Sequence, residues 1–307
     1  MKVYLESAGP GRHATILDVD MLRGKVQLVG KPSAADVCIY ATRGPGPKFQ
    51  GRTIMTYCEP PLGEGYLEPH QHPDRFRHVY TYRPHHPNQS PITELAIAYP
   101  YSPRVELDRP PRTELSPRRR VFYAGTRESG WMDQEDCCYR RNLYRARTAL
   151  VDDLRRLGTD VVAHGPGWGS VDNRRHGDFQ AMKVKEIDEC DADFVLCMEN
   201  SSLEHYISEK IHSGWHSGRV TLYLGSPTAA QLVPKECYVD LLPYYDISRH
   251  RVDAQAVRDI IMGMTPEQYR SMTAAAAEWR RESRPQERYL EQKRLLTTKI
   301  MRRIGCQ

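Results

Sequence analysis

Apolar and polar positions alternate in blocks along the second half of the chain, and these blocks predict a regular succession of strands and helices. Apolar runs at Val121–Ala124, Phe194–Met198 and Val220–Leu224 have the length of buried strands. Among these runs lie segments whose apolar residues recur every three or four positions, which predicts helices over 140–157 and 181–189. This alternation is typical of a parallel sheet with helices on both faces.

The first hundred residues also carry short apolar runs, separated by turn signals such as Gly-Pro-Gly at 9–11. Most of these runs are predicted to be strands of an N-terminal α/β domain, in which few stretches favour a long helix. Residues 59–92 are rich in proline and histidine and are predicted to be loop. The runs comprise Lys2–Leu5, 15–17, 26–29, Val37–Tyr40 and 53–57.

Polar residues are concentrated just beyond the apolar run Phe194–Met198. Glu199 and Asn200 follow it, and Ser208 is a good N-cap for a helix that starts near Lys210 and stops at Gly218. In open α/β sheets, ligands bind at the carboxyl ends of the strands. A lysine beside free backbone N–H groups suits an anion such as a pyrophosphate. Glu199 itself either joins this site or holds the loop through backbone N–H groups.

Composition narrows the class of protein. With 307 residues, the chain is long enough for two domains of ordinary size. The formal net charge of +5 suits a polyanionic small ligand and is low for a nucleic-acid-binding protein, so no nucleic-acid partner is expected. Neither a membrane-spanning run nor a signal peptide is evident, which predicts a cytoplasmic protein. The eight cysteines lack CxxC spacing and are predicted to be free thiols.

Four segments follow from these patterns. An N-terminal α/β domain spans 1–104, and a charged, proline-bearing passage at 105–119 is predicted to be a linker. A Rossmann-like domain spans 120–284. Residues 285–307 are predicted to form a basic amphipathic helix. The apolar side of this helix favours packing on the N-terminal domain. The alternative interpretation is that its basic side makes peripheral contact with an anionic membrane.

The residues around the polar cluster resemble the signature of the α1,3/α1,4-fucosyltransferases. Residues 198–211 read MENSSLEHYISEKI, where the family has F-E-N-S and then Y-V-T-E-K-I. Met198 replaces Phe, Ile207 replaces Val and Ser208 replaces Thr, and each change preserves shape or capping ability. The strong match covers residues 194–240.

Three further blocks occur in the order that this family has. Residues 57–61 resemble its E-S-P turn, residues 80–83 its M-T-Y-R segment, and residues 224–239 its closing G-S-P run. The resemblance implies a GT-B fold, with two Rossmann-like domains facing one cleft. It further implies an inverting transfer of L-fucose from GDP-β-L-fucose to a glycan acceptor, with an α1,3-type linkage and an oligosaccharide or lipid-linked glycan as partner.

The resemblance also implies how the departing diphosphate is stabilised. Lys210 is expected to be catalytic, because its ammonium neutralises the charge that builds up on the leaving group. An arginine of the predicted helix over 140–157 is expected to grip phosphate oxygens through its planar fork. The spacing favours Arg147, with Arg145 and Arg141 as alternatives.

Further donor-binding residues follow from the same resemblance. Glu209 and Asn200 are expected to bind hydroxyls of the ribose or of the sugar, and Tyr206 is expected to stack or hydrogen-bond near the donor. Gly125 and Thr126 lie after a predicted strand and are expected to approach the diphosphate, although the family has Ser-Asn there.

The acceptor side depends on the loop predicted over 59–92. Glu59 matches the acidic residue of the family's E-S-P turn and is expected to be the general base, with Glu64 and Glu68 as alternatives. Three other side chains are expected to bind the acceptor: Tyr82, Arg83 and His70.

No metal site and no obligatory cofactor are expected, and a divalent cation would be non-essential. The histidines of residues 70–86 make metal binding a minor alternative, because their spacing is not that of a good zinc site. Two other functions remain open: the same scaffold with a different nucleotide sugar, and a non-catalytic protein that binds a glycan or anion.

Overall fold

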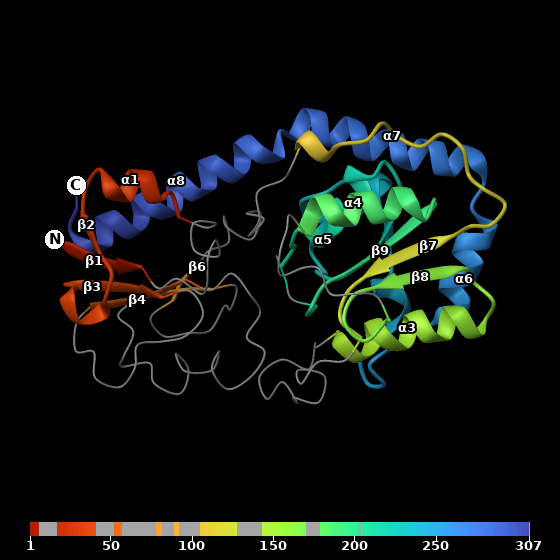
Figure 1. The fold of residues 1–307 in the computed structure, drawn as a ribbon, viewed down its shortest axis with the longest axis horizontal. Coiled ribbons are helices and arrows are strands. Elements are labelled where there is room, and N and C mark those ends of the chain that lie inside the picture. Colours follow the sequence, from red (N-terminus) through yellow and green to blue (C-terminus); the bar gives the residue numbers. More distant parts are fainter. Residues whose placement is uncertain are drawn as a thin grey trace. The chain divides into compact units, whose positions relative to one another are not determined.

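A computed structural model divides the chain into two compact units, each built around its own sheet (Figure 1). The first unit contains Met1–Ser102 and Gln286–Gln307, and the second contains Pro103–Pro285. The structure describes residues 1–5, 17–40, 52–56, 78–81, 89–91, 105–127, 143–169, 179–202, 204 and 206–306.

Within the described residues, the sheet of the first unit is parallel throughout, in the order β2-β1-β3-β4-β5-β6. The strands predicted from the first apolar runs are confirmed at β1 to β4. Residues 59–92, predicted to be loop, instead contain β5 and β6. The run His-Val-Tyr-Thr in β5 suits a strand, and Pro91 is tolerated in β6 because that strand lies at the edge of the sheet. The strands are β1 (Lys2–Leu5), β2 (Gln27–Val29), β3 (Val37–Tyr40), β4 (Arg52–Thr56), β5 (His78–Thr81) and β6 (Gln89–Pro91).

The C-terminal helix α8 (Pro285–Ile304) belongs to the first unit rather than standing apart. Its buried residues Leu296 and Ile300 pack with Val3 of β1, and the hydroxyl of Thr297 accepts a hydrogen bond of 2.8 Å from the backbone N–H of Asp18. Asp18 is the N-cap of the short helix α1 (Val19–Arg23). The apolar side of α8 therefore packs against the sheet as expected, and membrane contact by its other side stays a prediction. Every helix in the described part of the chain is too short or too polar to span a bilayer.

The second unit contains a parallel sheet in the order β11-β10-β9-β7-β8, together with a small antiparallel ribbon of β12 and β13. The strands predicted from the three apolar runs of the second half are confirmed as β7, β9 and β10. The strands of this unit are β7 (Val121–Ala124), β8 (Val161–His164), β9 (Phe194–Met198), β10 (Val220–Leu224), β11 (Val239–Asp240), β12 (Tyr245–Asp246) and β13 (Arg251–Val252).

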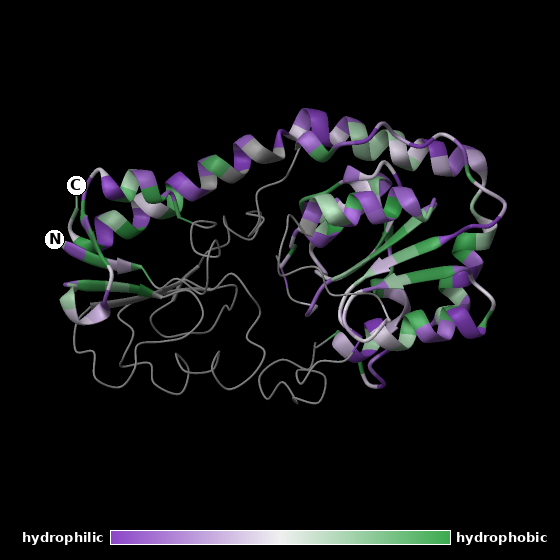
Figure 2. Ribbon diagram, in the orientation of Figure 1, coloured by the Kyte–Doolittle hydropathy of each residue, from purple (hydrophilic) through white to green (hydrophobic). Residues whose placement is uncertain are grey.

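Helices cover both faces of this sheet, as the alternating pattern predicts. Figure 1 shows α4 and α5 on one face and α3 with α6 on the other, and α7 packs against α5 and β10. In Figure 2 the strands are mostly apolar, while the helices show polar residues toward the outside. The helices are α3 (Tyr144–Arg156), α4 (Phe179–Glu189), α5 (Lys210–His216), α6 (Ala254–Gly263) and α7 (Pro266–Ser283).

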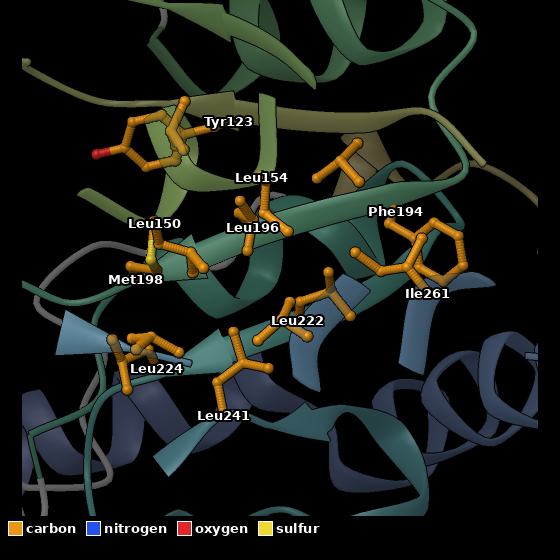
Figure 3. Packing of buried hydrophobic residues seen from close by; sticks show 14 of the residues in the cluster. Tyr123, Leu150, Leu154, Phe194, Leu196, Met198, Leu222, Leu224, Leu241 and Ile261 are labelled. Atoms are coloured by element: carbon orange, nitrogen blue, oxygen red, sulfur yellow. The ribbon is translucent and has the colours of Figure 1, made fainter. Parts of the chain in front are cut away.

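The core of the second unit forms where α3 and α6 meet the sheet (Figure 3). Leu150 and Leu154 of α3 are fully buried, as are Leu222 of β10 and Ile261 of α6. Each such side chain contributes about 1.5–3 kcal/mol by leaving water. The core therefore fixes the strand ends firmly in place.

The strand order creates a topological switch point in the second sheet. From β7 the chain passes through α3 to β8 on one side, and then through α4 to β9 on the other side of β7. The next strands therefore lie on opposite sides of β7 and β9, and in open α/β sheets ligands bind at such a point. Gly125 follows β7 and Glu199 follows β9, so the predicted donor-binding segments lie at this switch point.

Residues 105–119, predicted to be a linker, pack along the second unit instead. The backbone N–H groups of Arg109 and Arg112 donate to the carbonyls of His216 and Gly218 at 2.7 and 2.9 Å. The fully buried carboxylate of Asp193 accepts hydrogen bonds from the hydroxyl and backbone N–H of Ser116. Backbone N–H groups and a serine of this segment thus make tertiary hydrogen bonds, and composition alone does not distinguish such a segment from a solvated linker.

Gly218 ends α5 and also lets this segment approach. Its φ of +70° lies in the left-handed region, and a Cβ built on it would lie 2.2 Å from the carbonyl oxygen of Pro110. The helix stop predicted at Gly218 therefore has two causes, one in the backbone and one in the packing.

We predict that Gly218→Ala lowers the free energy of unfolding by about 1–3 kcal/mol, because the methyl group meets both the strained φ and the Pro110 carbonyl. Urea unfolding followed by circular dichroism measures this. Gly263→Ala is the matched control, since a Cβ there meets nothing within 4 Å. Equal unfolding midpoints for the two variants would contradict the prediction.

Candidate functional site

The side chain of Glu199 ties the end of β9 to the start of α5. It is completely buried, and its Oε1 and Oε2 accept hydrogen bonds from the backbone N–H and the hydroxyl of Ser208 at 2.7 and 2.6 Å. The Tyr223 hydroxyl adds a longer contact of 3.4 Å to Oε1. Of the two interpretations of Glu199, the geometry supports the one in which it holds the loop through a backbone N–H.

Lys210 is the first residue of α5, and its ammonium lies among oxygen atoms. Nζ is 3.6 Å from Oε2 of Glu199 and 3.6 Å from Oε1 of Glu209, and it donates to the Ser208 hydroxyl at 3.1 Å. The side chain keeps 19% of its surface exposed, whereas those of Glu199 and Glu209 keep 0% and 11%. Of these three charged side chains, that of Lys210 is the most exposed, and its positive charge suits an incoming anion.

The predicted N-cap Ser208 has a different role from the expected one. The helix α5 starts one residue later than a Ser208 cap implies, with Glu209 at the cap position and no side-chain cap bond. The Ser208 hydroxyl does accept a hydrogen bond of 3.3 Å from the backbone N–H of Lys210. Because that hydroxyl also donates to Glu199, it links the strand end to the first turn of the helix.

Arg147 and Asn200 come together as a second polar pair. Nη1 of Arg147 donates to Oδ1 of Asn200 at 2.8 Å and to the Glu199 carbonyl at 3.3 Å. Arg147 is 3% exposed, because it lies on the same buried stripe as Leu150 of α3 and as Leu143, the residue before that helix. Its guanidinium lies over the Tyr144 ring at 4.1 Å from the centroid.

Of the three arginines considered for this helix, the structure therefore brings Arg147 to the site. Arg145 is exposed at the helix surface, and Arg141 lies outside the described residues. The Nε of Arg147 has no hydrogen-bond partner among the described residues although it is buried.

The turn after β7 lies at the same edge of the sheet as Glu199, because β7 pairs with β9 in parallel. A Cβ on Gly125 would lie 2.1 Å from the Tyr123 hydroxyl, so no larger residue fits without displacing that ring. The backbone N–H of Gly125 donates to the His164 carbonyl at 3.0 Å, which places the Gly125-Thr126 turn at the carboxyl end of β7. Tyr206 is 1% exposed and thus faces the protein interior.

Buried charges alter the acidity of the two glutamates in opposite directions. Burial raises the pKa of Glu199, and the nearby Lys210 ammonium opposes this only in part. Burial also favours the neutral form of Glu209, but the ammonium groups of Lys210 and Lys183 outweigh it and lower the pKa of Glu209 below its usual range. Glu209 is therefore held as a carboxylate beside Lys210.

Lys183 is a charged residue of the site that sequence reasoning missed. It lies on α4, is 4% exposed, and lines a cavity of about 10 Å³ together with Lys210 and Cys197. Burial lowers its pKa, and the Glu209 carboxylate opposes that shift. The signal available in the sequence is weak, because Lys183 resembles any lysine on an amphipathic helix.

Several predicted residues lie outside the described part of the chain: Glu59, Glu64, Glu68, His70, Tyr82, Arg83 and the other histidines between 70 and 86 apart from His78 in β5. The base, the acceptor residues and the minor metal site therefore stay predictions. Among the described residues, no group of three or more His, Cys, Asp or Glu side chains is arranged to hold a metal ion.

The described residues form a compact polar site at the carboxyl edge of a parallel sheet. An ammonium and a guanidinium reach it from two helices, Lys210 from α5 and Arg147 from α3. The Glu209 carboxylate and the Asn200 amide lie next to them. Two cations can bind the oxygens of a diphosphate, while a carboxylate and an amide can bind hydroxyl groups.

Comparison with known proteins agrees with this arrangement at the level of the fold. No protein-family model and no curated protein sequence matches the chain. Solved structures do resemble it. The crystal structure of an α1,3-fucosyltransferase has a TM-score of 0.52 and 14% identity over 89% of this chain and 80% of its own. Crystal structures of an α1,3-fucosyltransferase with GDP and with GDP-fucose each have a TM-score of 0.52 and 13% identity over the same shares. The expected fold class, two Rossmann-like α/β units of the GT-B type, is confirmed.

We predict that Glu199→Ala destabilises the protein by about 1–3 kcal/mol, because it leaves the buried N–H and hydroxyl of Ser208 without their acceptor. The free energy of unfolding in urea is the measurement. Glu204→Ala in the same loop is the control, since Glu204 is exposed. A loss no larger than that of the control would show that the carboxylate does not hold this loop.

Proposed function

We propose that this protein is an inverting glycosyltransferase that moves L-fucose from GDP-β-L-fucose to a hydroxyl of a glycan acceptor, in an α1,3-type linkage. The observation that carries the proposal is the convergence of Lys210 and Arg147 at the switch point of the second sheet. The likeness of the fold to α1,3-fucosyltransferase structures with GDP and GDP-fucose supports the choice of donor.

Cleavage of the sugar–phosphate bond leaves negative charge on the diphosphate. In this proposal the Lys210 ammonium, which is 19% exposed, binds the departing phosphate oxygens. The Arg147 guanidinium, fixed by Asn200 and by two backbone carbonyls, adds a second positive charge that needs no reorganisation. Fixed cations in a partly dry site stabilise developing charge more strongly than solvated ones do.

The hydroxyl groups of the donor require acceptors and donors of hydrogen bonds. Glu209 is held as a carboxylate, so that its oxygens can accept hydrogen bonds from ribose or sugar hydroxyls. The Oδ1 atom of Asn200 accepts from Arg147, which leaves its amide N–H groups for the ligand. Backbone atoms of Gly125 and Thr126 approach the diphosphate from the neighbouring strand end in this proposal.

The attacking hydroxyl must lose a proton as the new bond forms. Glu59 is proposed as the base, and Tyr82, Arg83 and His70 are proposed to bind the acceptor. These assignments depend on the sequence resemblance. An oligosaccharide or lipid-linked glycan as acceptor, a cytoplasmic location and contact of α8 with a membrane are proposals of the same kind.

Two other functions make different predictions about the ligand. A related enzyme with another nucleotide sugar would release its nucleotide from that sugar and not from GDP-fucose. A non-catalytic binding protein would retain a glycan or an anion without releasing any nucleotide. The presence of Lys210 and Arg147 at one strand edge favours an enzyme, because a binding protein has no need to stabilise a leaving group.

We predict release of GDP from GDP-fucose, and of little nucleotide from GDP-mannose, UDP-galactose or UDP-N-acetylglucosamine. Lys210→Met should lower kcat/KM by about 100- to 1,000-fold, roughly 2.7–4 kcal/mol of barrier, because the leaving-group charge loses its cation. Lys235→Met is the control, since Lys235 is an exposed lysine of the same unit. Coupled detection of GDP measures both. If Lys210→Met turns over as fast as the control, the proposed role of Lys210 is wrong.

Because two protein cations can serve the diphosphate, we predict that turnover of GDP-fucose persists in excess EDTA. The initial rate in EDTA should stay within about twofold of that in Mg²⁺ or Mn²⁺, well short of a tenfold change of about 1.4 kcal/mol. A rate that vanishes in EDTA and returns on adding Mn²⁺ would show that a metal ion neutralises the leaving group.

A further inference from the structure

The hydroxyl of Ser208 makes three hydrogen bonds inside the candidate site. A serine hydroxyl has one hydrogen to donate and two lone pairs that accept. The Ser208 oxygen lies 3.1 Å from Nζ of Lys210 and 3.3 Å from the backbone nitrogen of the same residue, and both groups donate to it. The hydrogen of the hydroxyl is thus left for Oε2 of Glu199, which lies at 2.6 Å.

These bonds have a fixed direction, from the ammonium through the hydroxyl to the carboxylate. An ammonium and a backbone N–H have no lone pair, so neither group can accept a hydrogen bond from Ser208. Ser208 and Glu199 are both buried, which keeps water from competing for the same positions. The place of the hydroxyl is therefore set by three partners at once.

The hydroxyl also separates two opposite charges. Nζ of Lys210 is 3.1 Å from the Ser208 oxygen but 3.6 Å from the nearest oxygen of Glu199, and it is 3.6 Å from an oxygen of Glu209 as well. A direct hydrogen bond between an ammonium and a carboxylate is about 2.7–2.9 Å long, so neither ion pair is in direct contact. Because opposite charges attract more strongly in a buried site than in water, we expect Nζ to move onto the Glu199 carboxylate when the hydroxyl is removed.

Resting on the proposed function, we propose that Ser208 is a positioning residue whose hydroxyl keeps the Lys210 ammonium apart from the Glu199 carboxylate and thereby leaves it to the diphosphate of the donor. Ser208 is buried and does not touch the nucleotide in this arrangement. It acts through Lys210, which binds the departing phosphate oxygens in the proposed function.

The separation of the two charges can be tested without any ligand. Ser208→Ala removes the hydroxyl but keeps the backbone N–H that donates to Oε1 of Glu199 at 2.7 Å, so the loop keeps an anchor. In a crystal structure of this variant, the distance from Nζ of Lys210 to Oε2 of Glu199 should shorten from 3.6 Å to about 2.8 Å. A distance equal to that in a crystal structure of the wild-type protein would overturn the inference.

The link to donor binding is tested by calorimetry with GDP. Ser208→Ala should weaken GDP binding by roughly tenfold, the size of one hydrogen bond to a charged group. Ser208→Thr keeps the hydroxyl and should bind GDP more tightly than Ser208→Ala does. Ser217→Ala is the matched control, because the buried Ser217 hydroxyl lies at the other end of α5 and donates to the uncharged Gly214 carbonyl at 2.8 Å. An equal loss of GDP affinity in the two alanine variants would overturn the inference.

A double-mutant cycle separates action through Lys210 from a general loss of structure. If Ser208 acts through that ammonium, Ser208→Ala should cost little GDP affinity once Lys210→Met has removed the charge. An equal cost in both backgrounds would overturn the inference, and thermal melting of each variant identifies any loss of folding. If the wild-type protein fails to bind GDP, the proposed function fails, while the crystal structures still decide whether Ser208 separates the two charges.

Discussion

The contact between Glu199 and Ser208 connects the two halves of the candidate site. Asn200 follows Glu199 in the chain, and Glu209 and Lys210 follow Ser208. The two short hydrogen bonds from Ser208 to the carboxylate therefore set the separation between the amide held by Arg147 and the ammonium of Lys210. This contact is a buried polar anchor at the far end of the loop between β9 and α5, directly before the first turn of α5.

The cost of the arrangement lies in its buried charges. Taking a carboxylate or an ammonium out of water costs several kcal/mol unless partners replace the lost hydration. Here Lys210 lies between two such partners, with its Nζ 3.6 Å from an oxygen of Glu199 and 3.6 Å from an oxygen of Glu209. Packed apolar residues would be at least as stable in these positions. The presence of these three ionisable groups is thus explained better by binding and chemistry than by stability.

The sheet determines where these groups can meet. Because β8 and β9 lie on opposite sides of β7, the carboxyl ends of β7 and β9 form a topological switch point, which is where open α/β sheets bind ligands. The segment over 105–119 supports the opposite end of α5 through the carbonyls of His216 and Gly218. The helix that begins with Lys210 is thus fixed at both ends, by a carboxylate at one and by a packed segment at the other.

Much of this could be predicted from the sequence because it depends on local pattern. The alternation of apolar runs and helical periodicities reflects the burial of each element and does not depend on distant partners. The frame from Glu199 to Lys210 spans one loop, so its residues are close in space whatever the rest of the chain does. Gly218 was predictable as a helix stop for the same reason.

Other features depend on contacts between residues far apart in the chain, and only the tertiary structure decided them. Lys183 looks like a surface lysine until α4 packs against α5 and buries it. The segment over 105–119 looks like a linker until Asp193 and Gly218 accept its hydrogen bonds. The strands β5 and β6 are short, and the prolines and histidines around them obscured their pattern, since pairing with neighbouring strands stabilises such strands more than their own composition does.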